Sequence, residues 1–78
     1  MFNREDFKKS GGDVLKVRIG KRIIYLYPEF IDEDTQTIKG YQVNKQGEIV
    51  YTKWSHRIEF TVHFRQVADY LSIWAEEI

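Results

Sequence analysis

The sequence predicts a small α+β domain, in which an antiparallel sheet of about five strands is packed by a C-terminal helix and preceded by a short N-terminal helix. Three observations indicate this fold class. Apolar residues alternate over several short runs, turn residues separate these runs, and the apolar spacing changes from two to three and four near the C-terminus. A helix with a wide apolar stripe can cover one side of an antiparallel sheet. An SH3-like small barrel with the same C-terminal helix is the alternative.

The chain is long enough for one domain only. With 78 residues it can bury a single modest core. Apolar residues make up 42% of the chain and cysteine is absent, so hydrophobic packing rather than disulfides must hold the fold together. The predicted parts of the domain 1–78 are a helical turn with a Ser-Gly-Gly hinge at 1–12, the sheet at 13–61 and the C-terminal helix at 62–78.

The predicted N-terminal helix is short. Asn3 suits the N-cap position, Glu5 and Asp6 suit the first turn, and Ser10-Gly11-Gly12 ends the helix. Because isolated helices of this length are marginal in water, we expect this one to dock on the sheet.

The first hairpin is predicted to turn at Gly20-Lys21, because glycine at the first central position is what a type II′ turn requires. Counting back from this turn gives the register of the two strands. Val17 then faces Ile24 on the core side of the sheet, and Lys16 faces Tyr25 on the outer side. The remaining predicted pairs are Leu15 with Leu26 on the core side, and Arg18 with Ile23 and Val14 with Tyr27 on the outer side.

The second hairpin is predicted to turn at Asn44-Lys45-Gln46-Gly47, with the glycine in a left-handed bulge position. This turn places Val43 opposite Ile49 and Tyr41 opposite Tyr51. These four residues carry more apolar surface than the set that alternates with them, so we expect them to face the core. The alternating set is Ile38, Gly40, Gln42, Val50, Thr52 and Trp54.

The C-terminal helix is predicted from apolar residues that recur at three and four. They are Phe64, Val67, Ala68, Leu71, Trp74, Ala75 and Ile78. Residues 58–64 also alternate as a strand would, and Thr61 suits an N-cap, so we expect the strand to give way to the helix there. Trp74 is expected in the core.

The residue types that catalysis or cofactor binding needs are not grouped in this sequence. There is no Gly-x-Ser-x-Gly elbow and no glycine-rich phosphate loop, and His56 and His63 lack the spacing of a metal site. We therefore expect no enzyme activity, no metal and no cofactor. No apolar run approaches the roughly 18 residues of a membrane span, and the start of the chain does not resemble a signal peptide. A cytoplasmic protein without membrane contact is expected.

The strongest functional signal is the outer side of the first hairpin, where basic and aromatic residues lie together. Tyrosine, tryptophan and arginine are enriched in protein-binding hot spots, so we expect a small regulator or inhibitor that binds a protein. Nucleic acid is the alternative partner, because cations contact phosphates while aromatic rings stack on bases. The predicted binding residues are Lys16, Arg18, Tyr25, Tyr27, Trp54 and Arg57.

Two further expectations concern assembly and origin. An exposed sheet edge can pair with the same edge of another copy, which would give a homodimer. A stand-alone regulator of this size also fits a phage or mobile-element origin.

Overall fold

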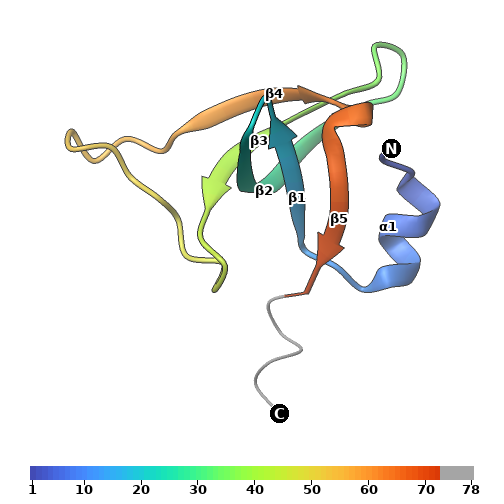
Figure 1. Cartoon of the computed structure of the whole chain (residues 1–78), viewed down its shortest axis with the longest axis horizontal. Helices are drawn as coiled ribbons and strands as arrows, with labels where there is room; N and C mark the ends of the chain where they lie inside the picture. The colour runs from blue at the N-terminus through green and yellow to red at the C-terminus, as the bar shows by residue number, and fades with distance from the viewer. Residues whose placement is uncertain (73–78) are drawn as a thin grey trace.

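The computed structural model of the protein describes residues 1–72. Its sheet has five strands in the order β4-β3-β2-β1-β5, and all neighbours are antiparallel (Figure 1). This arrangement agrees with the predicted α+β class. The elements are α1 (Arg4–Ser10), β1 (Val14–Ile19), β2 (Arg22–Asp32), β3 (Thr37–Val43), β4 (Glu59–His63), the 3-10 turn η1 (Phe64–Gln66) and β5 (Val67–Leu71).

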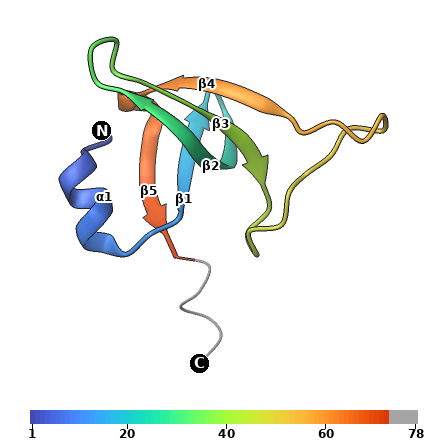
Figure 2. The same cartoon turned by 180° about the vertical axis from the view of Figure 1, so that it is seen from behind.

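The sheet is curled, as Figures 1 and 2 show. Strands β4 and β5 form its opposite edges, yet only η1 joins them. In a flat sheet the two edges would lie about 19 Å apart, at about 4.8 Å per strand. The step from His63 to Val67 spans at most about 14 Å even when fully extended. The edges must therefore approach each other, and the inner side of the curl encloses the core.

The predicted N-terminal helix and first hairpin are confirmed. The Asn3 side chain caps α1 by accepting a hydrogen bond from the Asp6 backbone N–H at 3.1 Å. The β1–β2 register matches the prediction at all four of the pairs that can be compared, including Lys16 with Tyr25. Gly20 has a φ of 61°, as its place in the turn requires.

Strand β2 is irregular in the middle of its pairing with β3. The register shifts between Pro28 and Phe30, which is the mark of a β-bulge. Gly40 lies opposite Pro28, and a Cβ atom at Gly40 would collide with the backbone carbonyl of Tyr27. Only glycine allows the two strands to approach this closely at the bulge.

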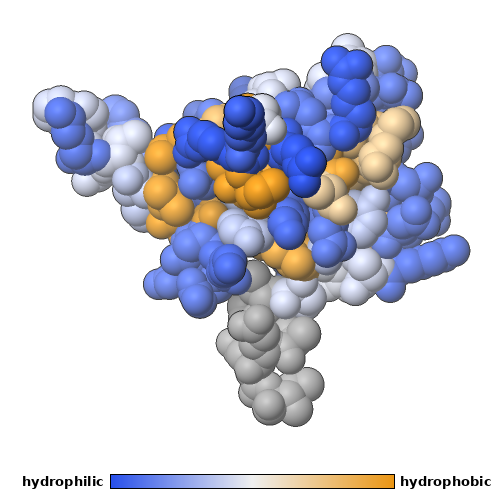
Figure 3. Space-filling view, in the orientation of Figure 1, coloured by the Kyte–Doolittle hydropathy of each residue, from blue (hydrophilic) through white to orange (hydrophobic). Residues whose placement is uncertain are grey.

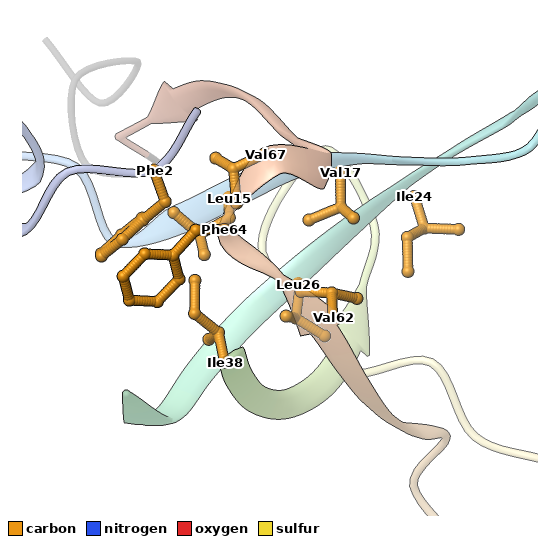
Figure 4. Packing of buried hydrophobic residues seen from close by; sticks show 9 residues of the cluster. All are labelled: Phe2, Leu15, Val17, Ile24, Leu26, Ile38, Val62, Phe64 and Val67. Carbon is orange, nitrogen blue, oxygen red and sulfur yellow. The ribbon is translucent and has the colours of Figure 1, made fainter. Parts of the chain in front are cut away.

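The core lies on the inner side of the curled sheet and receives residues from every strand (Figure 4). Phe2 joins it from the N-terminal segment, with its ring centroid 4.9 Å from that of Phe64 and 5.7 Å from that of Phe7. These contacts hold α1 against the β5 side of the sheet. The cluster of buried residues is Phe2, Leu15, Val17, Ile24, Leu26, Ile38, Val62, Phe64 and Val67.

The prediction of a helix at 62–78 is wrong for the part that the structure describes. Residues in this part form the end of β4, η1 and β5. A reciprocal cap marks the start of this single helical turn: the His63 N–H donates to Gln66 Oε1 at 2.7 Å, and the Arg65 N–H donates to His63 Nδ1 at 3.2 Å. Val67–Leu71 then pairs with β1, which would otherwise be an open edge. Trp74, predicted in the core, lies outside the described residues.

The second hairpin is confirmed only at its turn. Gly47 has a φ of 83° and its N–H donates to the Asn44 carbonyl at 2.9 Å, and Val43 bridges Ile49 as predicted. Beyond that bridge, however, β3 pairs with β4, so Tyr41 lies opposite Glu59 rather than Tyr51.

The predicted inward set of this hairpin is therefore also wrong in part. Ile38 is fully buried in the core, whereas Tyr41 lies on the outer side of the sheet and Tyr51 is 56% exposed. Val43 is buried, but it lies outside the main core cluster. The β2–β3 register explains this direction, since Tyr41 lies opposite Tyr27 and Val43 opposite Tyr25, both on the outer side of β2.

Candidate binding face

The outer side of the β1–β2 hairpin carries four of the predicted binding residues. Lys16 and Arg18 come from β1, and Tyr25 and Tyr27 come from β2. They point outward because their neighbours in sequence fill the core and side chains alternate along a strand. Tyr25 lies half-buried between Lys16 on one side and Val43 on the other, whereas Tyr27 is 40% exposed.

Strand β3 extends this surface with a stacked aromatic pair. Tyr27 lies opposite Tyr41 in the β2–β3 register. Their ring centroids are 5.3 Å apart and the ring planes are inclined by 19°. Such offset stacking adds about 0.5 to 1.5 kcal/mol beyond the area that the rings bury, so the pair forms a fixed aromatic platform.

Arg57 completes the platform from the segment between β3 and β4. Its guanidinium lies 4.6 Å from the centroid of the Tyr41 ring, and its Nη2 atom lies 3.6 Å from Oε1 of Glu29. A bridge between Arg57 and Tyr51 brings a third tyrosine beside the pair. We call the resulting surface the tyrosine face; it consists of Lys16, Arg18, Tyr25, Tyr27, Tyr41 and Arg57.

The surroundings of Tyr41 keep its hydroxyl protonated. Burial raises the pKa of Tyr41 above its ordinary value of 10.0, and the nearby Tyr27 and Glu29 raise it further, while Arg57 opposes them. At neutral pH the Tyr41 hydroxyl is therefore a neutral group that can both donate and accept a hydrogen bond.

Trp54 lies apart from this platform, at the tip of a projecting arm that we define as residues 49–58 (Figures 1 and 2). The side chain of Trp54 is 70% exposed, and Lys53 Nζ lies 5.0 Å from the centroid of its ring. The structure thus brings five of the six predicted residues onto one side of the molecule. It does not bring Trp54 to them.

Sequence reasoning missed Tyr41, which it placed in the core. Ile38 and Tyr41 have opposite parity along β3, so only one of them can face inward. The signal that could have identified Tyr41 is the outward direction already assigned to Tyr27, because Tyr41 lies opposite Tyr27 once β2 and β3 are paired. Glu29 and Tyr51 were also missed, because they join the site through Arg57: Glu29 by an ion pair and Tyr51 by a β-bridge.

Charges of both signs surround the tyrosine face. Lys16 lies opposite Asp69 in the β1–β5 register, and Arg57 pairs with Glu29. Glu59 lies opposite Tyr41. Figure 3 shows one side of the molecule, on which apolar patches alternate with hydrophilic groups.

A shallow hollow of about 520 Å³ lies at the far end of β2, beside the acidic turn that joins β2 to β3. Phe30, which is 62% exposed, lies at the hollow, and Arg4 Nε pairs with Glu33 Oε1 at 2.8 Å beside it. The Asp32 carboxylate accepts hydrogen bonds from the backbone of Asp34 at 3.0 Å and Thr35 at 3.3 Å, which fixes the loop. The hollow is lined by Arg4, Phe30, Ile31, Asp32, Glu33 and Asp34.

Within residues 1–72, no three side chains of histidine, aspartate or glutamate come together as metal ligands would. No helix in this part of the chain has both the length and the apolar character to cross a membrane. Comparisons with known protein families, with curated proteins and with solved structures find no match to this chain.

Proposed function

We propose that this chain is a non-enzymatic protein-binding domain, a regulator or inhibitor, and that its partner docks on the tyrosine face. The observation that carries the proposal is the stacked Tyr27–Tyr41 pair with Arg57 over it, held on the outer side of the sheet. Tyrosine and arginine dominate protein-binding hot spots because they combine large contact area with hydrogen-bonding groups. The strands and the stack hold these side chains in place, so little conformational entropy is lost on binding.

The charge pattern favours a protein over nucleic acid. A phosphate backbone requires a surplus of basic groups, because affinity comes from the release of counterions. Here Asp69, Glu29 and Glu59 lie among the basic and aromatic residues of the face, and the whole chain has a net charge of zero. Mixed charges around an aromatic centre are instead typical of the rim of a protein interface.

The architecture supports an SH3-like small barrel as the finer description of the fold. Four consecutive strands form an antiparallel meander, and η1 returns the chain so that β5 pairs with β1. In this arrangement the inner side is filled by the core, and only the outer side and the loops remain for binding.

Site-specific photo-crosslinking tests the proposal. A photoreactive phenylalanine analogue replaces Tyr51, which is 56% exposed and bridges Arg57 while leaving the Tyr27–Tyr41 stack intact. The matched control places the same analogue at the exposed residue Lys8 of α1. In cells of the source organism we expect one defined protein adduct from position 51, none of the same mass from position 8, and loss of the adduct when Tyr41→Ala is added.

An amide NMR titration with short single- and double-stranded DNA and RNA tests whether nucleic acid is the partner instead of a protein. The titration is run at about 50 and 200 mM salt, because phosphate contacts weaken steeply over that range. We expect no salt-sensitive shifts at Lys16, Arg18, Tyr25 or Tyr27. Shifts clustered on these residues would replace the protein partner with nucleic acid, and the absence of both adduct and shifts would remove the tyrosine face as a binding surface.

A further inference from the structure

The tip of the arm is a rigid turn that presents Trp54. Thr52 organises it: the Thr52 N–H donates to the His56 carbonyl at 2.8 Å, and the Thr52 carbonyl accepts from the Ser55 N–H at 2.9 Å. The Thr52 hydroxyl oxygen also accepts from the backbone N–H groups of Trp54 at 3.2 Å and His56 at 3.3 Å. These hydrogen bonds fix the backbone of the turn, so the exposed Trp54 side chain projects from a defined point of the arm.

The arm is basic as well as aromatic. Residues 49–58 contain Lys53, His56 and Arg57 but no aspartate or glutamate. Because Arg57 is engaged with Glu29 and Tyr41, Lys53 is the cation that accompanies Trp54 at the tip. A surface that receives this tip therefore needs an apolar contact for the indole and an acidic rim for the lysine.

The hollow at the end of β2 has this chemistry. Phe30 and Ile31 provide apolar surface at the hollow. At its rim Arg4 pairs with Glu33 and the Asp32 carboxylate accepts two backbone hydrogen bonds, so Asp34 is the carboxylate that can face an incoming lysine. Phe30 is among the most exposed aromatic residues of the described chain, at 62%. A tryptophan side chain buries about 150 to 250 Å² when it docks, which would cover exposed surface on both sides of the contact.

A single molecule does not fill its own hollow. Figures 1 and 2 show the arm and the turn between β2 and β3 on opposite sides of the body of the protein. The arm therefore does not lie at the hollow of its own molecule, whereas the arm of a second copy carries the matching chemistry. Two copies in antiparallel orientation bring each arm to the hollow of the other, which closes the assembly with two-fold symmetry.

We propose that two copies of this chain associate reciprocally, with the Trp54 tip of each arm seated in the hollow beside Phe30 of the other and Lys53 facing Asp34. This contact goes beyond the proposed function, since it uses neither Tyr27 nor Tyr41 and leaves the tyrosine face available to a different protein. Surface charge pairs add little energy alone, so the aromatic contact supplies the affinity and the charges select the orientation.

Sedimentation of the full chain over a series from low micromolar to near-millimolar concentration tests the proposal. We expect a monomer–dimer equilibrium whose dissociation constant rises at least about tenfold in Trp54→Ala and in Phe30→Ala, as for hot-spot residues. Both side chains are exposed, so the melting temperatures of the two variants at low concentration should match that of the parent. Tyr27→Ala, on the tyrosine face, is the matched control and should leave the dimer unchanged.

A charge-exchange experiment tests which surfaces meet. Lys53→Glu and Asp34→Lys should each weaken self-association, by about two- to fivefold for a surface pair. An equimolar mixture of the two variants should associate more tightly than either alone, because both contacts in the mixed dimer join opposite charges. Lys45→Glu makes the same charge change on the neighbouring turn and should have no effect.

Three outcomes would overturn the proposal. They are a monomer at every concentration, a dimer that persists in both Trp54→Ala and Phe30→Ala, and a mixture of charge variants no tighter than its components. A persistent dimer that is lost in Tyr27→Ala would locate the contact on the tyrosine face, and one that survives all three alanine variants would locate it at a sheet edge.

Discussion

Replacing Gly40 with alanine should destabilise the fold and the tyrosine face together. A Cβ atom at this position would overlap the Tyr27 carbonyl and lie 3.1 Å from Pro28 Cα. Both obstacles are backbone, so strands β2 and β3 must separate to admit the methyl group. Overpacking of this kind lowers the free energy of unfolding by about 1 to 3 kcal/mol. Alanine also reduces the conformational entropy of the unfolded chain, which raises the free energy of unfolding by about 0.4 to 1 kcal/mol. Because the obstacles are backbone atoms that cannot rotate away, we expect an overpacking cost in the upper part of its range and a net decrease of about 2 kcal/mol in the free energy of unfolding.

Urea unfolding and a thermal melt measure this loss. A domain of this size is stabilised by about 4 to 12 kcal/mol, and each kcal/mol shifts its melting temperature by about 4 to 8 °C. Gly40→Ala should therefore melt about 8 to 16 °C below the parent. Lys39→Ala is the matched control, because this neighbour is exposed on the same strand and should change stability by less than about 0.5 kcal/mol. A Gly40→Ala variant as stable as the parent would refute the close approach of β2 and β3.

Three further outcomes follow from the structure. Leu26→Ala, at a fully buried core position, should lower the free energy of unfolding by about 2 to 5 kcal/mol in a urea titration. Because the pKa of Tyr41 is raised in the folded protein, its favourable effect on stability is complete below pH 10 and is lost as pH rises through the folded pKa; phenolate absorbance compared with Tyr41→Phe should show the late titration. Arg57→Ala should raise the Tyr41 pKa further, since Arg57 lowers it, and an earlier titration in that variant would contradict the placement of the guanidinium.

The parts of the fold that the sequence predicts correctly are those whose determinants are local. The register of β1 and β2 follows from one two-residue turn at Gly20-Lys21, and the pairs can then be counted. The helix α1 follows from its cap at Asn3 and its glycine at Gly11, which has a φ of 68°. Neither inference needs a contact between residues that are far apart in the sequence.

The C-terminal helix could not be corrected from the sequence because two periods fit the same residues. Phe64, Val67 and Leu71 recur at three and four, as on a helix. The same spacing arises when a 3-10 turn is followed directly by a strand. Phe64 is then buried at the start of the turn, and Val67 is buried at the start of the strand. What decides between them is the open edge of β1, whose pairing with Val67–Leu71 is a contact across about fifty residues of sequence.

The tyrosine face was predicted in part for a related reason. Lys16, Tyr25 and Tyr27 belong to the locally determined hairpin, so their outward direction could be counted from the turn. Tyr41 reaches the face through the β2–β3 register, which places it opposite Tyr27, and no local turn signal in the sequence predicts that register. The direction assigned to Tyr41 was reversed because its set was judged the more apolar of the two alternating sets, and apolar surface alone does not separate a core position from an exposed aromatic patch.

The long connection between β3 and β4 explains why this small domain has more than one surface for binding. Connections between strands in compact domains are usually short, and long ones are commonly functional. The chain between β3 and β4 forms two tight turns, at Asn44–Gly47 and Thr52–His56, instead of adding to the core. Its base contributes Arg57 to the tyrosine face, while its tip carries Trp54 away from the sheet. Arg57 therefore belongs to both regions: its side chain lies over the Tyr41 ring, and its backbone bridges Tyr51 at the root of the arm.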